Sequence, residues 1–220
     1  MTVIVGLVHE DQVYIGGDSA GVGGCRLTIR KDPKVFCNGP YAMGFCGSFR
    51  MGQLLHHAFK APKPKGELDR FMTTKFVNKL RACLKEAGWA RKESEQEQGG
   101  TFLVGIYGRL FIVYGDYQVA EPADGYAAVG CGNEFALGAL HATATTDLTP
   151  RERLTVALAG RRQPSQHGRL RALHLHHRAP AQRTAPARSR PVHEGDGTHP
   201  QGRGACGCVN RWSCSTSTTP

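Results

Sequence analysis

Two apolar runs at the start of the chain constrain its fold more than any other feature. Residues 3–8 and 13–17 are rich in β-branched side chains and flank a polar segment, 9–12, a pattern that predicts a β-hairpin. Both faces of the first run are apolar, so the sheet that contains it must be covered on both sides. A chain of 220 residues is one domain by length and is large enough for such a layered core.

Helices are expected in two blocks. Four segments carry apolar residues at helical spacing: 48–59, 67–87, 133–144 and 149–159. Ser48 is a suitable N-cap for the first, and Gly88 ends the second. Thr149 and Glu152 form a capping box at the start of the last, with Pro150 at the first helical position.

Further strands are expected between and after these helices, at 34–36, 41–46, 101–107, 110–114 and 127–129. The glycine-rich segment 21–24 and the polar segment 91–100 are expected to be loops. The chain therefore alternates between blocks of strands and pairs of helices. This order allows two stacked sheets with a layer of helices on each side.

The positive charge of the chain is concentrated in its C-terminal part. The formal net charge is +10, and residues 161–220 hold +8 of it, with ten arginines, no lysine and two acidic residues. We therefore divide the chain into a near-neutral domain, residues 1–160, and a basic tail rich in Arg, His and Pro, residues 161–220. Three interpretations of the tail are open: a disordered natural extension, a nucleic-acid-binding arm and a shifted reading frame.

Residues 173–178, Leu-His-Leu-His-His-Arg, suggest the shifted frame. Histidine codons read one base onward encode Ile or Thr, and suitable leucine codons would encode Phe, so residues 171–179 would become an apolar strand. The chain would then lack the last strands and the closing helix of its fold, and sheet edges would be exposed. Only the tail supports a nucleic-acid partner, so we do not expect one for the domain.

The cysteines and the N-terminal segment indicate a cytoplasmic protein. Eight cysteines are present, and those in residues 1–160 are scattered without paired spacing, which fits free thiols better than a disulfide framework. The N-terminal apolar run follows no basic residues and is too short for a signal peptide. No stretch reaches the length of a membrane span, so no membrane partner is expected. The helical histidines lack ligand spacing, and we expect neither a metal nor a cofactor.

Thr2 is the first candidate catalytic residue. If Met1 is removed, Thr2 carries both a hydroxyl and a free α-amine. The pKa of such an amine is about 7.7–8.0 in model peptides, so it can act as a base near neutral pH. Nucleophile and general base would then lie on one residue. The alternative is an ordinary threonine on an edge strand.

Three further features follow Thr2 in register. Asp18 ends the second apolar run, Lys34 precedes a Val-Phe pair, and Gly47 lies in a Cys-Gly-Ser turn after a further strand. With these spacings, residues 2–159 resemble the proteasome β-subunit family, and within it the bacterial HslV-like peptidases. Members of that family are N-terminal-nucleophile hydrolases. The resemblance selects an α+β fold, a four-layer α-β-β-α sandwich, from the arrangements that the sequence pattern allows.

The resemblance implies a role for each of these residues. The Thr2 hydroxyl would attack a carbonyl carbon, and the Lys34 ammonium would lower the pKa of the hydroxyl and of the amine. Asp18 would orient and neutralise Lys34, and the backbone N–H of Gly47 would donate to the developing oxyanion. The alternatives are a solvated lysine, with Lys31 as the competing candidate, a turn-capping aspartate and a glycine in a strand-to-helix turn.

Cys131 takes the place of a serine within the same resemblance. Residues 130–132, Gly-Cys-Gly, match a Gly-Ser-Gly turn whose serine hydroxyl supports the threonine amine, and a thiol is the weaker donor and acceptor. Cys46 either lines the substrate pocket or fills the core. A later aspartate of the family's active-site network would fall in the tail.

The resemblance implies a threonine-type peptidase that cleaves peptides or unfolded proteins through an acyl-enzyme ester on Thr2. Removal of Met1 would be the only maturation step. A homo-oligomeric ring and an ATP-dependent unfoldase are the implied partners. Two alternatives stay open, because a fold does not fix a chemistry: a non-catalytic structural or assembly subunit of such a ring, and an amidase that acts on small substrates.

Overall fold

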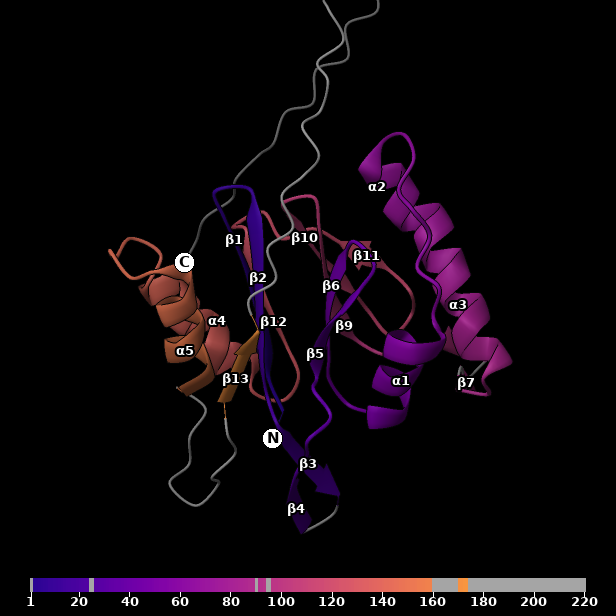
Figure 1. The fold of residues 1–220 in the computed structure, drawn as a ribbon, viewed down its shortest axis with the longest axis horizontal. Helices are drawn as coiled ribbons and strands as arrows, with labels where there is room; N and C mark the ends of the chain where they lie inside the picture. Colours follow the sequence, from indigo (N-terminus) through magenta and orange to yellow (C-terminus); the bar gives the residue numbers. More distant parts are fainter. Residues whose placement is uncertain (1, 24–25, 90, 94–95, 160–169, 174–220) are drawn as a thin grey trace, which may run out of the picture. The chain divides into compact units, whose positions relative to one another are not determined.

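Two antiparallel sheets form the centre of the fold (Figure 1). The computed structural model describes residues 2–23, 26–89, 91–93, 96–159 and 170–173, all within one compact unit, Met1–Gln182. One sheet has the strand order β12-β1-β2-β13, and the other has the order β11-β10-β9-β6-β5. The strands of the first sheet are β1 (Ile4–His9), β2 (Gln12–Asp18), β12 (Tyr126–Val129) and β13 (Leu170–Leu173). The strands of the second are β5 (Val35–Asn38), β6 (Tyr41–Phe45), β9 (Phe102–Ile106), β10 (Arg109–Val113) and β11 (Val119–Ala120).

A layer of helices covers the outer face of each sheet. The second sheet packs against one layer, made of α1 (Phe49–Gln53) with its π-helical continuation η1 (Leu54–Ala58), and of α2 (Leu68–Phe71), η2 (Met72–Phe76) and α3 (Val77–Glu86) in one continuous segment. The first sheet packs against α4 (Asn133–Ala142) and α5 (Pro150–Ala159). The predicted four-layer α-β-β-α sandwich is therefore confirmed.

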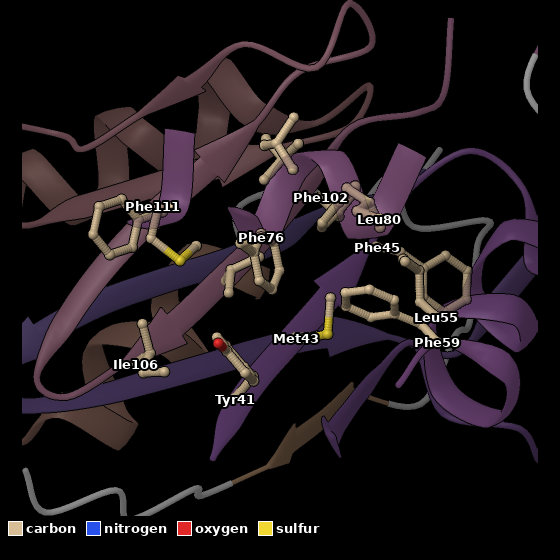
Figure 2. Close-up of a cluster of buried hydrophobic side chains, with 14 of the residues drawn as sticks. Tyr41, Met43, Phe45, Leu55, Phe59, Phe76, Leu80, Phe102, Ile106 and Phe111 are labelled. Carbon is tan, nitrogen blue, oxygen red and sulfur yellow. The ribbon is translucent and has the colours of Figure 1, made fainter. Parts of the chain in front are cut away.

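Three apolar clusters hold these layers together. The largest lies between the second sheet and helices α1–α3, where aromatic rings such as Tyr41 and Phe76 meet with their centroids 5.1 Å apart (Figure 2). A second cluster, which includes Leu7 and Leu154, lies between the first sheet and α4–α5. The third fills the space between the two sheets and includes Ile4. Full burial of a side chain such as Leu, Ile or Phe stabilises the folded state by about 1.5–3 kcal/mol relative to leaving it exposed.

The N-terminal hairpin forms as the apolar runs predict. β1 pairs with β2 from Ile4↔Gly17 to His9↔Gln12, and β12 pairs with its other edge. The turn between them is Glu10-Asp11, with φ of 48° and 57°, the conformation of a two-residue hairpin turn that matches the strand twist. Successive side chains of β1 alternate between the helix-covered face and the inter-sheet face, which explains why the whole run is apolar.

The predicted helix starts are also present. The hydroxyl of Ser48 accepts hydrogen bonds from the backbone N–H groups of Arg50 and Met51, at 3.1 and 3.4 Å. In the capping box the Thr149 N–H donates to Glu152 at 2.8 Å, and the Glu152 N–H donates to the Thr149 hydroxyl at 3.3 Å. These bonds satisfy N–H groups that have no partner within the first helical turn.

Two expected loops contain strands instead. Most of the glycine-rich segment lies in strand β3 (Ala20–Gly23), which pairs with β4 (Arg26–Ile29). The polar segment contains a second pair of strands, β7 (Arg91–Glu93) and β8 (Gln96–Gln98). The loop predictions are wrong there because backbone hydrogen bonds alone can pair two short strands. Such pairing needs no apolar alternation, which is the pattern that predicts a strand from sequence.

The tail contributes one strand to the first sheet. β13 pairs antiparallel with β2, from Leu170↔Asp18 to Leu173↔Ile15. These four residues are the part of the tail that the structure describes, so the three interpretations of residues 161–220 and the expected loss of the last strands stay predictions. The outer edge of β2 offers unpaired N–H and C=O groups that an added strand can satisfy. The rest of the tail lies outside the described residues, so the expected loss of the closing helix stays a prediction. The domain boundary at residue 160 stays a prediction as well.

Candidate active site

Three of the predicted site residues meet in one hydrogen-bonded group. The ammonium of Lys34 donates to the hydroxyl oxygen of Thr2 at 2.9 Å, to the Oδ1 atom of Asp18 at 2.8 Å and to the carbonyl oxygen of Ala20 at 2.6 Å. The carboxylate of Asp18 also accepts from the backbone N–H groups of Val3 and Ala20, each at 2.8 Å. Asp18 thus holds the backbone at Val3, the residue after Thr2, and is joined to the Thr2 hydroxyl through the ammonium.

The sheet topology explains why residues so far apart in sequence meet here. Ile4 pairs with Gly17, so the residues before β1 lie opposite the end of β2, where Asp18 is located. Lys34 precedes β5 in the second sheet, and β2 and β5 face each other across the inter-sheet core. The carbonyl of Lys34 accepts from the N–H of Phe45 at 3.1 Å, which also brings Lys34 next to the end of β6.

Lys34 and Asp18 form an ion pair that is almost fully removed from solvent. Their side chains are 3% and 0% exposed, so Lys34 is not a solvated surface lysine. An ammonium has three N–H donors, and Lys34 has three acceptors in this group. A buried pair of this kind costs desolvation energy and is kept only where its geometry is well satisfied. Asp18 also caps the turn at Ala20, so the structural role expected for it coexists with its contact to Lys34.

Gly47 lies between β6 and α1, directly before the N-cap Ser48. Its φ is +85°, a left-handed conformation that glycine adopts without strain. Apart from its two chain neighbours, no residue has a heavy atom within 4 Å of the place where a Cβ would be, so there is open space on that side of Gly47. Gly47 lines two neighbouring cavities, one of which also contains Thr2.

The turn at residues 130–132 holds the backbone of Thr2. The N–H of Gly132 donates to the carbonyl oxygen of Thr2 at 3.3 Å. Gly130 has a φ of +104° and passes so close to Thr2 that a Cβ on it would lie 2.5 Å from the same oxygen. Cys131 is exposed and lines the cavity that contains Thr2. Of the five predicted site residues, Thr2, Gly47 and Cys131 line this cavity, and Lys34 and Asp18 lie behind Thr2 in its hydrogen-bonded group.

That cavity has a volume of about 1040 Å³ and contains Thr2, Gly47 and Cys131 in its wall. Cys46 also lines it and donates its thiol to the carbonyl oxygen of Thr101 at 3.3 Å. Burial raises the pKa of Cys46 to about 11, with a further contribution from the nearby Cys131, so the thiol is neutral at physiological pH. Cys46 thus packs against the inter-sheet core and lines the pocket at the same time.

Sequence reasoning missed two contributors to this site. The carbonyl of Ala20 accepts the shortest hydrogen bond of Lys34 in this group, but a backbone oxygen leaves no trace in residue type. Thr101 separates the two cavities beside Gly47 and was expected only to begin a strand. Its position after a Gly-Gly pair was the available signal, since glycines allow close approach of the backbone.

Within the described part of the chain, no group of three or more His, Cys, Asp or Glu side chains is placed to hold a metal ion. None of the helices found there has both the length and the apolar character needed to cross a bilayer.

Comparisons with known proteins identify the relationship. No family model matches the chain. The ATP-dependent protease subunit HslV of Caldicellulosiruptor saccharolyticus is 28% identical to it over 157 residues, which cover 69% of this chain and 84% of that protein. The chain is thus similar in sequence to an HslV subunit.

Solved structures agree on the fold of this chain. Thiobacillus denitrificans BPH, in a complex with epoxomicin, matches it with a TM-score of 0.60 at 18% identity, over 78% of this chain and 97% of that one. HslV from Trypanosoma brucei matches with a TM-score of 0.51 at 20% identity, over 77% and 98% of the two chains. The predicted resemblance to the proteasome β-subunit and HslV-like family is thereby confirmed.

Proposed function

We propose that this protein is a threonine-type peptidase that uses Thr2 as its nucleophile. The observation that carries the proposal is the 2.9 Å contact between the ammonium of Lys34 and the hydroxyl oxygen of Thr2, held in place by the buried Asp18. Two comparisons support it: the relative with 28% identity is a subunit of an ATP-dependent protease, and BPH of the same fold binds epoxomicin.

The reaction would begin once Met1 is removed and Thr2 has a free amine. The Thr2 hydroxyl oxygen forms a bond to the carbonyl carbon of a peptide, and its proton passes to the amine, directly or through a water. The C–N bond of the resulting tetrahedral intermediate then breaks, and the departing nitrogen takes that proton. Water hydrolyses the remaining ester by the same steps in reverse order. The positive charge of Lys34 favours the ionised hydroxyl and the neutral amine throughout.

Two backbone elements complete this mechanism. The N–H of Gly47 would donate to the oxyanion of the intermediate, a contribution of roughly 3–4 kcal/mol for a well-placed donor. The open space at Gly47 allows a carbonyl oxygen to approach. The turn at residues 130–132 fixes the main chain of Thr2, and therefore the direction of its amine and hydroxyl. Cys131 would support the amine more weakly than a hydroxyl does.

We further propose that the protein acts in a homo-oligomeric ring with an ATP-dependent unfoldase, on peptides or unfolded proteins. Support comes from the relative, which is named as a subunit of an ATP-dependent protease. Light scattering coupled to size exclusion, with and without a candidate unfoldase, tests this assembly. A monomer under all conditions would remove this part of the proposal.

The decisive experiment is the intact mass of the full-length chain after incubation with epoxomicin. A species that lacks Met1 and carries one adduct is expected for the native chain, and no adduct is expected for Thr2→Ala. Thr155→Ala, an exposed threonine on α5, is the matched control and should be labelled like the native chain. Retention of Met1, or a folded protein that stays unlabelled, would favour the non-catalytic assembly subunit. Labelling together with cleavage of small amides but not of peptides would favour the amidase.

A further inference from the structure

The cavity beside Thr2 is much larger than the hydrogen-bonded group that borders it. From Thr2, Cys46 and Gly47 it extends between β10 and β12, the neighbouring strands of the two sheets. Its volume of about 1040 Å³ is at the upper end of the range for small-ligand pockets. The reaction proposed above needs only a narrow approach to the hydroxyl, so the remaining space is available for another part of a substrate.

The chemistry of the wall selects what this space can hold. Its apolar side chains come from β10, from β12 and from α4: Ile112, Tyr126, Ala127, Val129 and Leu137. Tyr114 also lines the cavity and is 38% exposed. None of the described residues that form the wall carries a charge. An ionic group would lose its hydration there without gaining a partner, whereas an apolar group would gain from burial.

The position of the turn at residues 130–132 decides which part of a substrate lies in this space. That turn lines the cavity and holds the main chain of Thr2, the residue that supplies the amine. The amine returns its proton to the nitrogen that leaves, so the leaving nitrogen must lie on the amine's side of the hydroxyl. We place the amine on the side of this turn, so the group attached to the leaving nitrogen would point into the cavity.

A separate space exists for the acyl part of the substrate. A second cavity, of about 430 Å³, lies beyond the shared wall of Cys46, Gly47 and Thr101 and is lined by Met51 and Trp89. Gly47, the proposed oxyanion donor, thus lies between the two cavities. A peptide whose carbonyl oxygen faces Gly47 can place one end in each of them.

We propose that the larger cavity binds a bulky uncharged side chain, aromatic or branched aliphatic, of the residue that follows the cleaved bond. This inference rests on the proposed function and adds a specificity site for the leaving group. Tyr114 is a suitable residue to change, since it lines the cavity, carries an aromatic ring and is partly exposed.

Binding to the full-length Thr2→Ala chain tests the site without any need for activity. Phenylalanyl-glycine amide and glycyl-glycine amide, two analogues of the leaving group, are titrated by calorimetry. We expect the phenylalanyl compound to bind at least ten times more tightly. An added Tyr114→Glu change should abolish most of this preference, because it places a carboxylate in an uncharged wall. Phe135→Ala on α4 is the control: Phe135 is 62% exposed and does not line the cavity, so the preference should persist.

Equal affinity for the two amides, or a preference that survives Tyr114→Glu, would overturn the inference. Cleavage of internally quenched peptides by the native chain separates this failure from failure of the proposed function. If epoxomicin labels Thr2 and the cleavage rate does not depend on the residue after the cleaved bond, the specificity site is refuted and the proposed peptidase activity is supported. If the phenylalanyl amide binds more tightly but Thr2 forms no adduct, the proposed peptidase activity is refuted and the apolar binding site is supported.

Discussion

The carbonyl oxygen of Thr2 lies 2.5 Å from the position that a Cβ on Gly130 would occupy. No side chain larger than hydrogen fits at Gly130 without moving the proposed nucleophile. The φ of +104° at Gly130 also requires glycine, because residues with a Cβ rarely adopt this backbone conformation. The turn at residues 130–132 therefore depends on Gly130 for both its conformation and its contact with Thr2.

Gly130→Ala is expected to displace Thr2 and to lower the free energy of unfolding by about 1–3 kcal/mol, the usual cost of a strained backbone position. Labelling of Thr2 by epoxomicin should be lost or strongly slowed. Gly138→Ala on α4 is the control, because no atom lies within 4 Å of its added methyl group. That change should stabilise the helix by about 0.5–1 kcal/mol. Urea unfolding of both variants, together with the labelling assay, checks the prediction.

The buried ion pair is expected to be costly to break from either side. Lys34→Met leaves the Asp18 carboxylate buried without its ammonium, and Asp18→Asn leaves the ammonium without its carboxylate. Each should lower the free energy of unfolding by about 3–5 kcal/mol and abolish labelling of Thr2. Arg30→Gln provides the contrast, since it removes a partly exposed pair with Asp32 and should cost less than about 1 kcal/mol. Equal losses in urea unfolding would show that burial is not the cause.

The capping box gives a prediction for stability that is independent of the site. Thr149→Ala removes the hydroxyl that accepts from the N–H of Glu152, and should lower the free energy of unfolding by about 1 kcal/mol. Thr155→Ala, an exposed position on the same helix, should change it by less than about 0.5 kcal/mol. Thermal unfolding of the two variants side by side distinguishes the cap from a general effect of losing a threonine.

The raised pKa of the Cys46 thiol predicts that the free energy of unfolding depends on pH in the alkaline range. Burial raises the pKa of this thiol from 9.0 to about 11, so the unfolded chain loses this proton first as pH rises. The free energy of unfolding should therefore fall between about pH 9 and pH 11. Burial also raises the pKa of Cys37 and of Cys83, which adds to the same trend. Cys46→Ala should show a shallower fall than the native chain in urea unfolding across this range, and parallel curves would contradict the assignment.

Local features of the sequence were enough to place most of the fold. The β1–β2 hairpin follows from two apolar runs around a short polar turn, and helix α5 follows from its capping box. Each signal lies within one segment of the chain, where spacing and residue type directly limit the backbone. The hairpin of β3 and β4 was not predicted, because a glycine-rich stretch carries no such signal. Strand β13 was not predicted either, because the edge of β2 with which it pairs is distant in sequence.

The sequence by itself determined which residue types are available at the site: a threonine directly after Met1, an aspartate at a strand end, a lysine before a strand and glycines in two turns. Only the tertiary structure decided that they meet. Thr2 and Asp18 are brought together by strand pairing, and Lys34 reaches them from the opposite sheet. Stacking of the two sheets buries the ion pair and leaves the apolar cavity beside it. Contacts between sheets depend on the packing of many side chains at once, and no single segment of sequence carries that information.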